Sequence, residues 1–307
     1  MSTLAETITT TDALGQSRAA RASRSLVRSA LGRFARDRVA MTALIIFVSV
    51  ALFAIFANLV SRWTGFTPYE NHLAQKLSAP GENGYVLGSD ANGRDILTRL
   101  AYGARVSITV AFMATLVELT IGLGIGLIAG YAGGWADSIL MRLVDVLLSI
   151  PTLPLLILIA TLYSPGTYTL ALIFALIFWP GDSRLIRGEA LAIKSREYVD
   201  AARVVGVSPV GIVLRHVLPN VVPVMIVLAS LTIPSLILVE SALSFIGVGI
   251  QVPEPSWGNM LDEAQRFYRT NWTYVFFPGF MIFITSLSLY LIGDGLRDAF
   301  DPKQSSR

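Results

Sequence analysis

The sequence predicts an all-α, polytopic membrane protein with six transmembrane helices, and two observations carry this prediction. The chain of 307 residues is 53% hydrophobic and only 15% charged, whereas soluble proteins carry about 25% charged residues. In addition, charges are nearly absent from several stretches of about 20 residues, which is the length that crosses a bilayer as a helix.

Six apolar segments account for the predicted spans. They cover residues 39–60, 107–130, 139–163, 168–180, 221–248 and 272–293. The fourth is short and ends at Pro180-Gly181, which predicts an interrupted helix of the kind that lines transport routes. In the second, Gly122, Gly126 and Gly130 recur every four residues and leave a bare face for close helix packing. This face suits a contact between subunits and packing within the chain equally well.

Basic residues give the orientation of the spans. Six spans place both termini on one side, and that side carries 17 of the 24 Lys and Arg residues. The positive-inside rule therefore places both termini in the cytoplasm. The predicted organisation is a cytoplasmic tail (1–38), a first transmembrane helix (39–60), an extracytoplasmic segment (61–103), a five-helix core (104–300) and a cytoplasmic C-terminus (301–307). Within the core, 189–220 forms a cytoplasmic loop and 249–271 an extracytoplasmic segment.

The tail at 1–38 carries seven Arg and no apolar core, which excludes a secretory signal peptide. Val27, Leu31 and Phe34 fall at helical spacing and predict a short amphipathic helix on the membrane surface that leads into the first span. A solvated basic tail is the main alternative, and an organellar transit peptide is a weaker one.

Several classes of function lack the residues that they need. The chain has no Cys, only two His (His72 and His216) and no Gly-Lys pair, which excludes thiolate sites and a phosphate-binding P-loop and disfavours a histidine metal site. No HExxH or G-x-S-x-G motif is present. We therefore expect a chain that is not an enzyme and that binds no cofactor, metal or nucleic acid. If ATP drives this protein, the ATPase is another chain.

The most informative segment is the polar stretch EYVDAARVVGVSPVGIVLRHVLPN at 197–220, which lies between two apolar spans. It predicts a helix, a break near Gly206 to Pro209, and a second helix that returns to the membrane. Gly206 can adopt the positive φ that ends a helix, while Ser208 and Pro209 suit the cap and first turn of the next one. The valines at 205, 207, 210 and 213 would be exposed to water, so the loop is expected to bind a protein partner.

The D-A-A triplet at 200–202, Gly206 and the L-P pair at 218–219 have the spacing of the EAA loop of ABC importer permeases, which this segment resembles. Asp200 replaces the Glu of that motif and His216 replaces its Ile. Five further runs are similar to peptide- and nickel-type permeases: LGSDANGRDILTRLAYGAR (87–105), MRLVDVLLSIP (141–151), ESALSFIGVG (240–249), PSWGNML (255–261) and GDGLRDAFDP (293–302). The short first loop and the last run resemble the C-type subunit of dipeptide and oligopeptide permeases.

This resemblance implies a type I ABC importer (MetI-like) permease fold and a transport subunit that is not an enzyme. It implies half of a translocation pathway for peptides in the lipid of a bacterial or archaeal inner membrane, completed by a homologous second permease. Two ATPase subunits would bind ATP and Mg²⁺, and an extracytoplasmic binding protein would deliver the cargo. The residues implied to couple the loop to an ATPase are Asp200, Ala201, Ala202, Arg203, Gly206, His216, Leu218 and Pro219.

Other cargoes and classes are alternatives. Nickel chelates, opines and oligosaccharides are carried by the same family. An ion-coupled secondary transporter would require inverted repeats and several coordinating residues within the spans, and no internal repeat is visible. A membrane-embedded enzyme would require a catalytic constellation, which the sequence lacks.

Three carboxylates lie inside predicted spans, where a charge is costly. Asp145 follows Arg142 by three residues, so we expect an ion pair between them. Glu240 is expected to bind neighbouring backbone or hydroxyl groups at a bend. Glu118 has no partner nearby in the sequence and could serve the translocation cavity or a structural role. The candidates for the cavity or pathway are Glu118, Pro180, Asp182 and Glu240.

Two extracytoplasmic stretches are expected to form short helices that contact the binding protein or surround the outer gate, with simple anchoring as the alternative. The first is 93–103, with Asn92 as a candidate cap, and the second is 257–268. In the second, Trp257, Leu261 and Phe267 would supply apolar contacts, and Asp262, Glu263 and Arg266 would stay in water.

Overall fold

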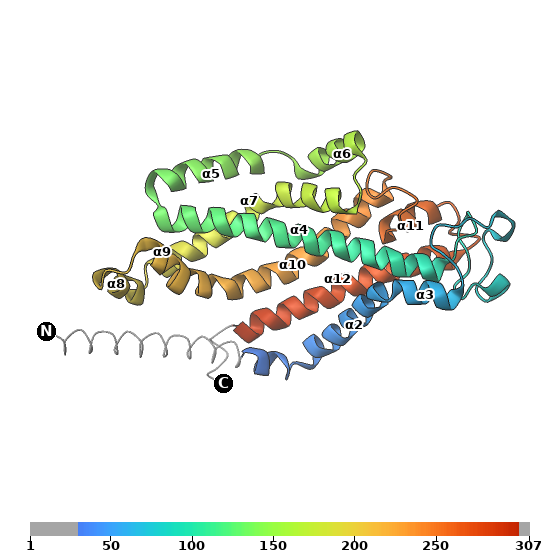
Figure 1. The fold of residues 1–307 in the computed structure, drawn as a ribbon, viewed down its shortest axis with the longest axis horizontal. Helices are drawn as coiled ribbons and strands as arrows, with labels where there is room; N and C mark the ends of the chain where they lie inside the picture. Colours follow the sequence, from blue (N-terminus) through green and yellow to red (C-terminus); the bar gives the residue numbers. More distant parts are fainter. Residues whose placement is uncertain (1–29, 301–307) are drawn as a thin grey trace.

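The computed structural model describes residues 30–300, which form helices joined by short loops and one longer irregular segment before α4 (Figure 1). The helices are α2 (Arg38–Ile55), α3 (Ala57–Thr64), α4 (Ile96–Ala132), α5 (Gly134–Leu148), α6 (Thr152–Tyr163), α7 (Thr167–Lys194), α8 (Glu197–Val204), α9 (Pro209–Ile212), α10 (Leu218–Phe245), α11 (Trp257–Ala264) and α12 (Trp272–Phe300). Two 3₁₀ turns, η1 (Leu73–Gln75) and η2 (Glu82–Gly84), lie in the irregular segment, and a π-helical turn, η3 (Val213–Val217), joins α9 to α10. Among the described residues the only β-type pairing is an isolated bridge between Ser89 and Asp95. The all-α prediction is confirmed.

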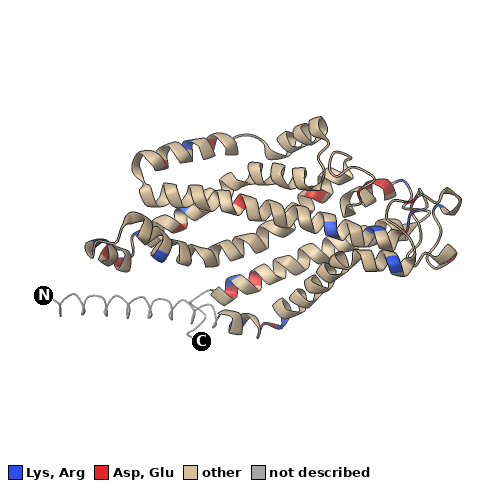
Figure 2. Cartoon of the chain, viewed as in Figure 1, with Lys and Arg blue, Asp and Glu red and all other residues tan. Residues whose placement is uncertain are grey.

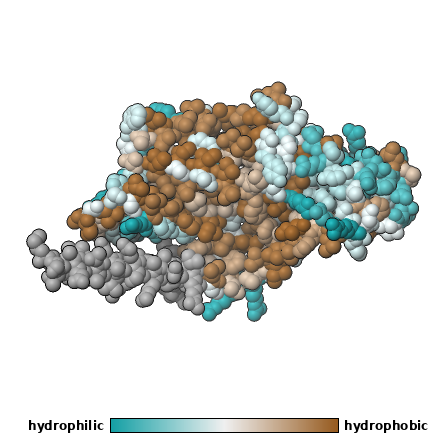
Figure 3. Space-filling model, in the orientation of Figure 1, coloured by the Kyte–Doolittle hydropathy of each residue, from teal (hydrophilic) through white to brown (hydrophobic). Residues whose placement is uncertain are grey.

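Five of these helices, α2, α4, α7, α10 and α12, are long and apolar enough to cross a membrane, and the bent pair of α5 and α6 makes a sixth span if it is counted as one. In Figure 1, α4 and α7 run side by side beneath α5 and α6, and α12 lies between α10 and α2. Hydrophobic residues cover the middle of the face shown in Figure 3, while Figure 2 shows most charged residues toward the two ends. The polytopic membrane architecture is therefore confirmed.

The second span begins much earlier than the sequence predicts. The expected short outer helix at 93–103 and the expected span at 107–130 are one continuous helix, α4, of 37 residues. Its cap is Asp95 rather than Asn92, because the Thr98 backbone N–H donates to Asp95 Oδ2 at 2.7 Å. No Pro interrupts 96–132, so nothing local ends the outer helix before the membrane begins.

The helix break expected in the fourth span is found in the third span instead. The segment predicted as one span at 139–163 is bent by 74° between α5 and α6, because Pro151 lacks an N–H and disfavours helix in the residue before it. The interruption expected at Pro180 is wrong: α7 continues through it for 28 residues. Pro180 is buried, and its carbonyl accepts a hydrogen bond from Ser183 Oγ at 2.8 Å. Packing within the bundle thus accommodates a Pro-containing helix.

The glycine face of α4 is filled by α7 of the same chain. A Cβ on Gly126 would lie 2.7 Å from the Ser183 carbonyl oxygen, and one on Gly130 would lie 2.7 Å from the Ala190 Cβ. Both distances are too short for any side chain larger than hydrogen. Of the two readings of the glycines, packing within the chain is therefore correct. We refer to this contact below as the α4–α7 seam.

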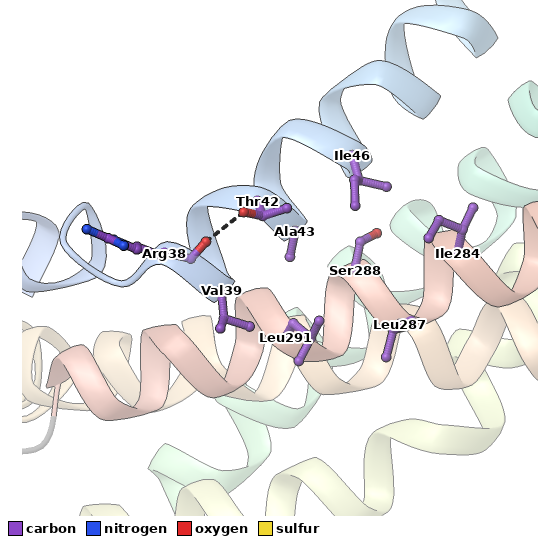
Figure 4. Close-up of a pocket in the computed structure, with 9 residues that line it drawn as sticks. All are labelled: Arg38, Val39, Thr42, Ala43, Ile46, Ile284, Leu287, Ser288 and Leu291. Atoms are coloured by element: carbon purple, nitrogen blue, oxygen red, sulfur yellow. Dashed lines mark hydrogen bonds between the residues drawn. The ribbon is translucent and has the colours of Figure 1, made fainter.

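At the other side of the bundle, α2 diverges from α12 and leaves a groove of about 320 Å³ (Figure 4). It is lined by Arg38, Val39, Thr42, Ala43, Ile46, Ile284, Leu287, Ser288 and Leu291. The hydroxyls of Thr42 and Ser288 donate to backbone carbonyls of their own helices. The groove therefore presents an almost entirely apolar surface.

The amphipathic helix predicted in the tail falls partly outside the described residues. Val27 lies outside them, and the described residues 30–34 are helical. Phe34 is buried against the end of α12, whereas Leu31 is 59% exposed. Leu31 and Phe34 therefore do not share one buried face, and Phe34 anchors the start of α2 to the bundle.

Candidate functional site

The loop between α7 and α10 folds as the sequence predicts. Gly206 ends α8 with a φ of +86°, a conformation that costs Gly little. Ser208 caps α9, because its Oγ accepts from the Gly211 N–H at 3.2 Å, and Pro209 occupies the first turn. The chain then passes through the π-helical turn η3 into α10. Three local signals at 206–209 thus build a helix, a sharp turn and a second helix.

One side of this loop is fixed to the transmembrane helices. Val199 of α8, Ile212 of α9 and Val217 of η3 are buried in one apolar cluster. The same cluster contains Leu127 of α4 and Ile186 of α7. The inner side of the loop therefore shares one close-packed apolar core with α4, α7 and α10.

The other side of the loop is open. Val204 is 88% exposed, Val205 77% and Val210 68%, although these side chains are apolar. Val207 and Val213, which we also expected to be exposed, are partly buried against the cluster described above. We call Val204, Val205 and Val210 the loop patch. Apolar side chains gathered in water around one turn indicate a protein partner.

The remaining residues of the predicted loop site surround this patch. Asp200 and Arg203 form an ion pair within α8, with Arg203 Nη1 donating to Asp200 Oδ1 at 2.7 Å, and both are well exposed. Ala201 is exposed and Ala202 packs inward. The half-buried His216 lies 6.3 Å from the Tyr198 ring. Leu218 and Pro219 form the first turn of α10.

The ion pair predicted between Arg142 and Asp145 is wrong. Asp145 of α5 instead accepts from Arg184 Nη2 of α7. A second pair joins the same two helices, because Arg187 donates to both oxygens of Asp137. Spacing along one helix allowed the first pairing, but the packing of α5 on α7 brings a guanidinium from another helix closer. These two bridges tie α5 to α7.

Glu240 lies inside the bundle and is completely buried. The Ser107 hydroxyl of α4 donates to Glu240 Oε2 at 2.9 Å, and the Ser244 hydroxyl donates to Oε1 at 2.8 Å. The expectation that hydroxyl groups would satisfy this carboxylate is confirmed. Because its partners come from α4 and α10, Glu240 links these helices and does not face an open surface of this chain.

The other two candidates for the pathway, Glu118 and Asp182, are neighbours across the α4–α7 seam. Glu118 is completely buried, and neither of its oxygens has a hydrogen-bond partner in the described part of the chain. Asp182 of α7 is partly buried and faces Gly122 of α4, because a Cβ on Gly122 would lie 3.0 Å from the Asp182 Cβ. The lack of a local partner for Glu118 was visible in the sequence, but its proximity to Asp182 was not.

A cluster of charges at the outer end was not predicted. Arg94 and Arg99 lie between Asp90 and Glu263, and the closest contacts are Arg94 Nε to Asp90 Oδ2 and Arg94 Nη2 to Glu263 Oε2, both 2.6 Å. The Tyr274 hydroxyl also donates to Glu263 Oε2, at 2.7 Å. We call these five residues the outer cluster. It ties the start of α4 to α11 and α12.

The prediction that Glu263 stays in water is therefore wrong. Its side chain is 19% exposed. Burial alone would raise the pKa of Glu263, but the charges of Arg99 and Arg94 and the hydrogen bonds from Arg94 and Tyr274 outweigh burial, and the pKa lies below its ordinary value. Arg99 and Glu263 are separated by 164 positions in the sequence, which explains why no spacing in the sequence revealed the pair.

Residues 122–306 match the family described as binding-protein-dependent transport system inner membrane component. The chain belongs to this family. Residues 25–80 match a second family, the N-terminal transmembrane domain of oligopeptide transport permease C. The resemblance to C-type ABC importer permeases is thereby confirmed, and the loop patch belongs to a transport subunit.

Similar proteins cover nearly the whole chain. The oligopeptide transport system permease protein OppC of Escherichia coli (strain K12) is 42% identical over 282 residues, which are 91% of this chain and 92% of the relative. OppC of Haemophilus influenzae is 40% identical over 282 residues, covering 91% and 89%. The dipeptide transport system permease protein DppC of Bacillus subtilis (strain 168) is 37% identical over 284 residues, covering 92% and 88%.

Proposed function

We propose that this chain is the transmembrane permease subunit of an ABC importer for peptides. It forms half of the translocation pathway with a homologous second permease, receives cargo from an extracytoplasmic binding protein, and moves in response to two separate ATPase subunits. The names of its relatives, which are oligopeptide and dipeptide permeases, support a peptide cargo.

The observation that carries the coupling role is the two-sided construction of the loop. Its inner side is packed against α4, α7 and α10, while the loop patch is open to water. An ATPase that covers the patch would exclude water from its apolar surface. Movement of that ATPase would then be transmitted through the close-packed core to three transmembrane helices. Asp200 and Arg203, on the exposed part of α8, are available to give the contact its orientation.

The proposed orientation places the loop in the cytoplasm together with both termini. The turn between α8 and α9, the start of α2 and the end of α12 lie toward one end of the bundle in Figure 1, and the irregular segment before α4 lies at the other. The excess of basic residues in the loop and the tail supports a cytoplasmic location for the first end. Localisation in a bacterial inner membrane follows as part of the proposal.

The variant Asp200→Lys tests the coupling role, because it reverses a charge on the exposed part of α8. The internal pair with Arg203 is exposed, so its loss costs the fold only about 0.5 kcal/mol. The matched control is Glu70→Lys, which reverses an exposed charge in the segment before α4. We expect both variants to insert and to pair with the second permease. Only Asp200→Lys should lose most peptide uptake and either release the ATPases or leave their hydrolysis insensitive to loaded binding protein.

Normal uptake, ATPase co-purification and stimulated hydrolysis in Asp200→Lys would contradict the coupling role. The cargo is tested separately, by measuring which ligands the associated binding protein retains. Retention of nickel chelates, opines or oligosaccharides in preference to peptides would replace the cargo and leave the coupling role in place.

A further inference from the structure

At the α4–α7 seam lie two acidic side chains, the buried Glu118 and the partly buried Asp182, which the transport function described above does not use. Glu118 is completely buried, and both of its oxygens lack a hydrogen-bond partner in the described residues. Asp182 lies opposite, since a Cβ on Gly122, one turn after Glu118, would be 3.0 Å from the Asp182 Cβ. Glu118 and Asp182 are therefore neighbours across the seam. Two like charges in such a place would oppose each other and would both be poorly solvated.

The basic groups nearest to this pair along the chain are occupied elsewhere. On α7, Arg184 and Arg187 bind Asp145 and Asp137 of α5. Among the described residues, no basic side chain forms an ion pair with Glu118 or Asp182, and this includes Arg142 of α5. The helices α2 and α12 carry charges only at one end.

The remaining acidic group in the middle of the bundle is also distant. Glu240 of α10 binds Ser107, which is eleven residues, or roughly 16 Å, before Glu118 along α4. Its serine partners account for both of its oxygens. The pair in the seam therefore has neither a counter-charge nor a share in another polar network.

A second observation points to the same place. The Thr115 hydroxyl, one turn before Glu118 on α4, is also buried without a hydrogen-bond partner. An ionised carboxylate that is buried and unpaired costs several kcal/mol, yet the seam is closed by glycine contacts that leave no space for a side chain. A small positive species must therefore neutralise the site.

The number of oxygen ligands available at the seam decides which positive species can bind there. Calcium requires six to eight oxygen ligands and magnesium an octahedron, and the described residues contain no group of three or more His, Cys, Asp or Glu side chains that could hold a metal ion. A cargo ammonium group would need a route to Glu118, which is completely enclosed. A proton requires only the two carboxylates.

We propose that Glu118, with Asp182 beside it, is an intramembrane proton-binding site, which holds one proton on the buried Glu118 carboxyl group while the α4–α7 seam is closed. The proton comes from water and returns to water. When the seam opens and water enters, both carboxylates become solvated and the proton leaves. The site thus links the packing of α4 on α7 to a protonation step, whatever the cargo is.

Infrared spectroscopy of the assembled transporter in lipid nanodiscs at neutral pH tests this site. We expect the carbonyl band of a protonated carboxyl group, shifted in D₂O, in the wild type. This band should be absent from the double variant Glu118→Gln with Asp182→Asn. Any band from Glu240 is present in both samples and cancels in the difference. If the double variant fails to assemble, Glu118→Gln alone serves, because Gln has nearly the shape of protonated Glu.

Two results would overturn the proposal. The first is an identical carboxyl band in the wild type and in the variant. The second is a band that appears only when Na⁺ and K⁺ are replaced by choline, which would assign the site to an alkali cation. As a further readout, the pH profile of peptide uptake should shift in Glu118→Gln. The infrared result does not depend on uptake, so its failure and a failure of the proposed peptide function can be told apart.

Discussion

The two ends of the bundle differ in whether their charged and apolar side chains are buried against the chain or exposed. At the outer end, the outer cluster pairs two buried Arg with the buried Asp90 and the partly buried Glu263. At the end that carries α8 and α9, the charges of Asp200 and Arg203 are exposed, and apolar valines are exposed as well. The first end pairs its charges within the chain, whereas the second leaves both charged and apolar side chains exposed.

This difference indicates where the chain is rigid and where it depends on other subunits. The outer cluster joins α4, α11 and α12 through buried contacts whose loss would leave charges unpaired. The loop patch contributes little to the stability of the fold, because valine side chains that stay exposed bury almost no apolar area on folding. Substitutions at the outer end should therefore affect stability, and substitutions at the loop should affect coupling.

The largest expected effect is on stability, from Arg99→Met. Arg99 is completely buried between Asp90 and Glu263, so its removal leaves two buried carboxylates with only Arg94 between them. We expect a loss of roughly 3–5 kcal/mol, measured as thermal or denaturant unfolding of the purified chain in detergent. The matched control Arg266→Met, at an exposed arginine just after α11, should change stability by less than about 0.5 kcal/mol. Equal unfolding of the two variants would show that the outer cluster does not stabilise this end.

The next effect separates the two ends by function. Gly206→Val and Gly65→Val place the same side chain on exposed glycines with φ of +86° and +77°, and neither new Cβ meets an atom of this chain within 4 Å. Both variants therefore incur a similar conformational cost of about 1–2 kcal/mol. Only Gly206→Val should also clash with an ATPase, so we expect peptide uptake to fall sharply in this variant alone. Equal uptake in the two variants would contradict a role of the turn at Gly206 in coupling to the ATPase.

The smallest effect concerns pH at the outer end. Because the folded-state pKa of Glu263 lies below its ordinary value of 4.5, this residue contributes its full stabilisation at pH values above 4.5. The contribution is lost as the pH falls through the lowered folded-state pKa. The stability difference between the wild type and Glu263→Gln should therefore be constant near neutral pH and should shrink below pH 4.5. A difference that stays constant down to the acid transition would contradict the charge-based account of this cluster.

The features that could be predicted from the sequence depend on a few neighbouring residues or on composition. Apolar stretches of membrane-spanning length gave the class of protein, and the turn at Gly206, Ser208 and Pro209 formed as predicted, because φ preference and capping act within about four residues. The runs of family-like sequence also gave the family. The exposure of Val205 and Val210 followed from the turn.

Only the tertiary structure decided which distant groups meet. Pro180 could not be assigned as a break or as a tolerated residue until the packing of α7 on α4 was known. Asp145 pairs with Arg184 instead of Arg142, and Glu263 pairs with arginines that lie far earlier in the chain. The partner of a charged side chain depends on which faces of separate helices pack together. That packing depends on the fit of whole helix surfaces, which no short stretch of sequence specifies.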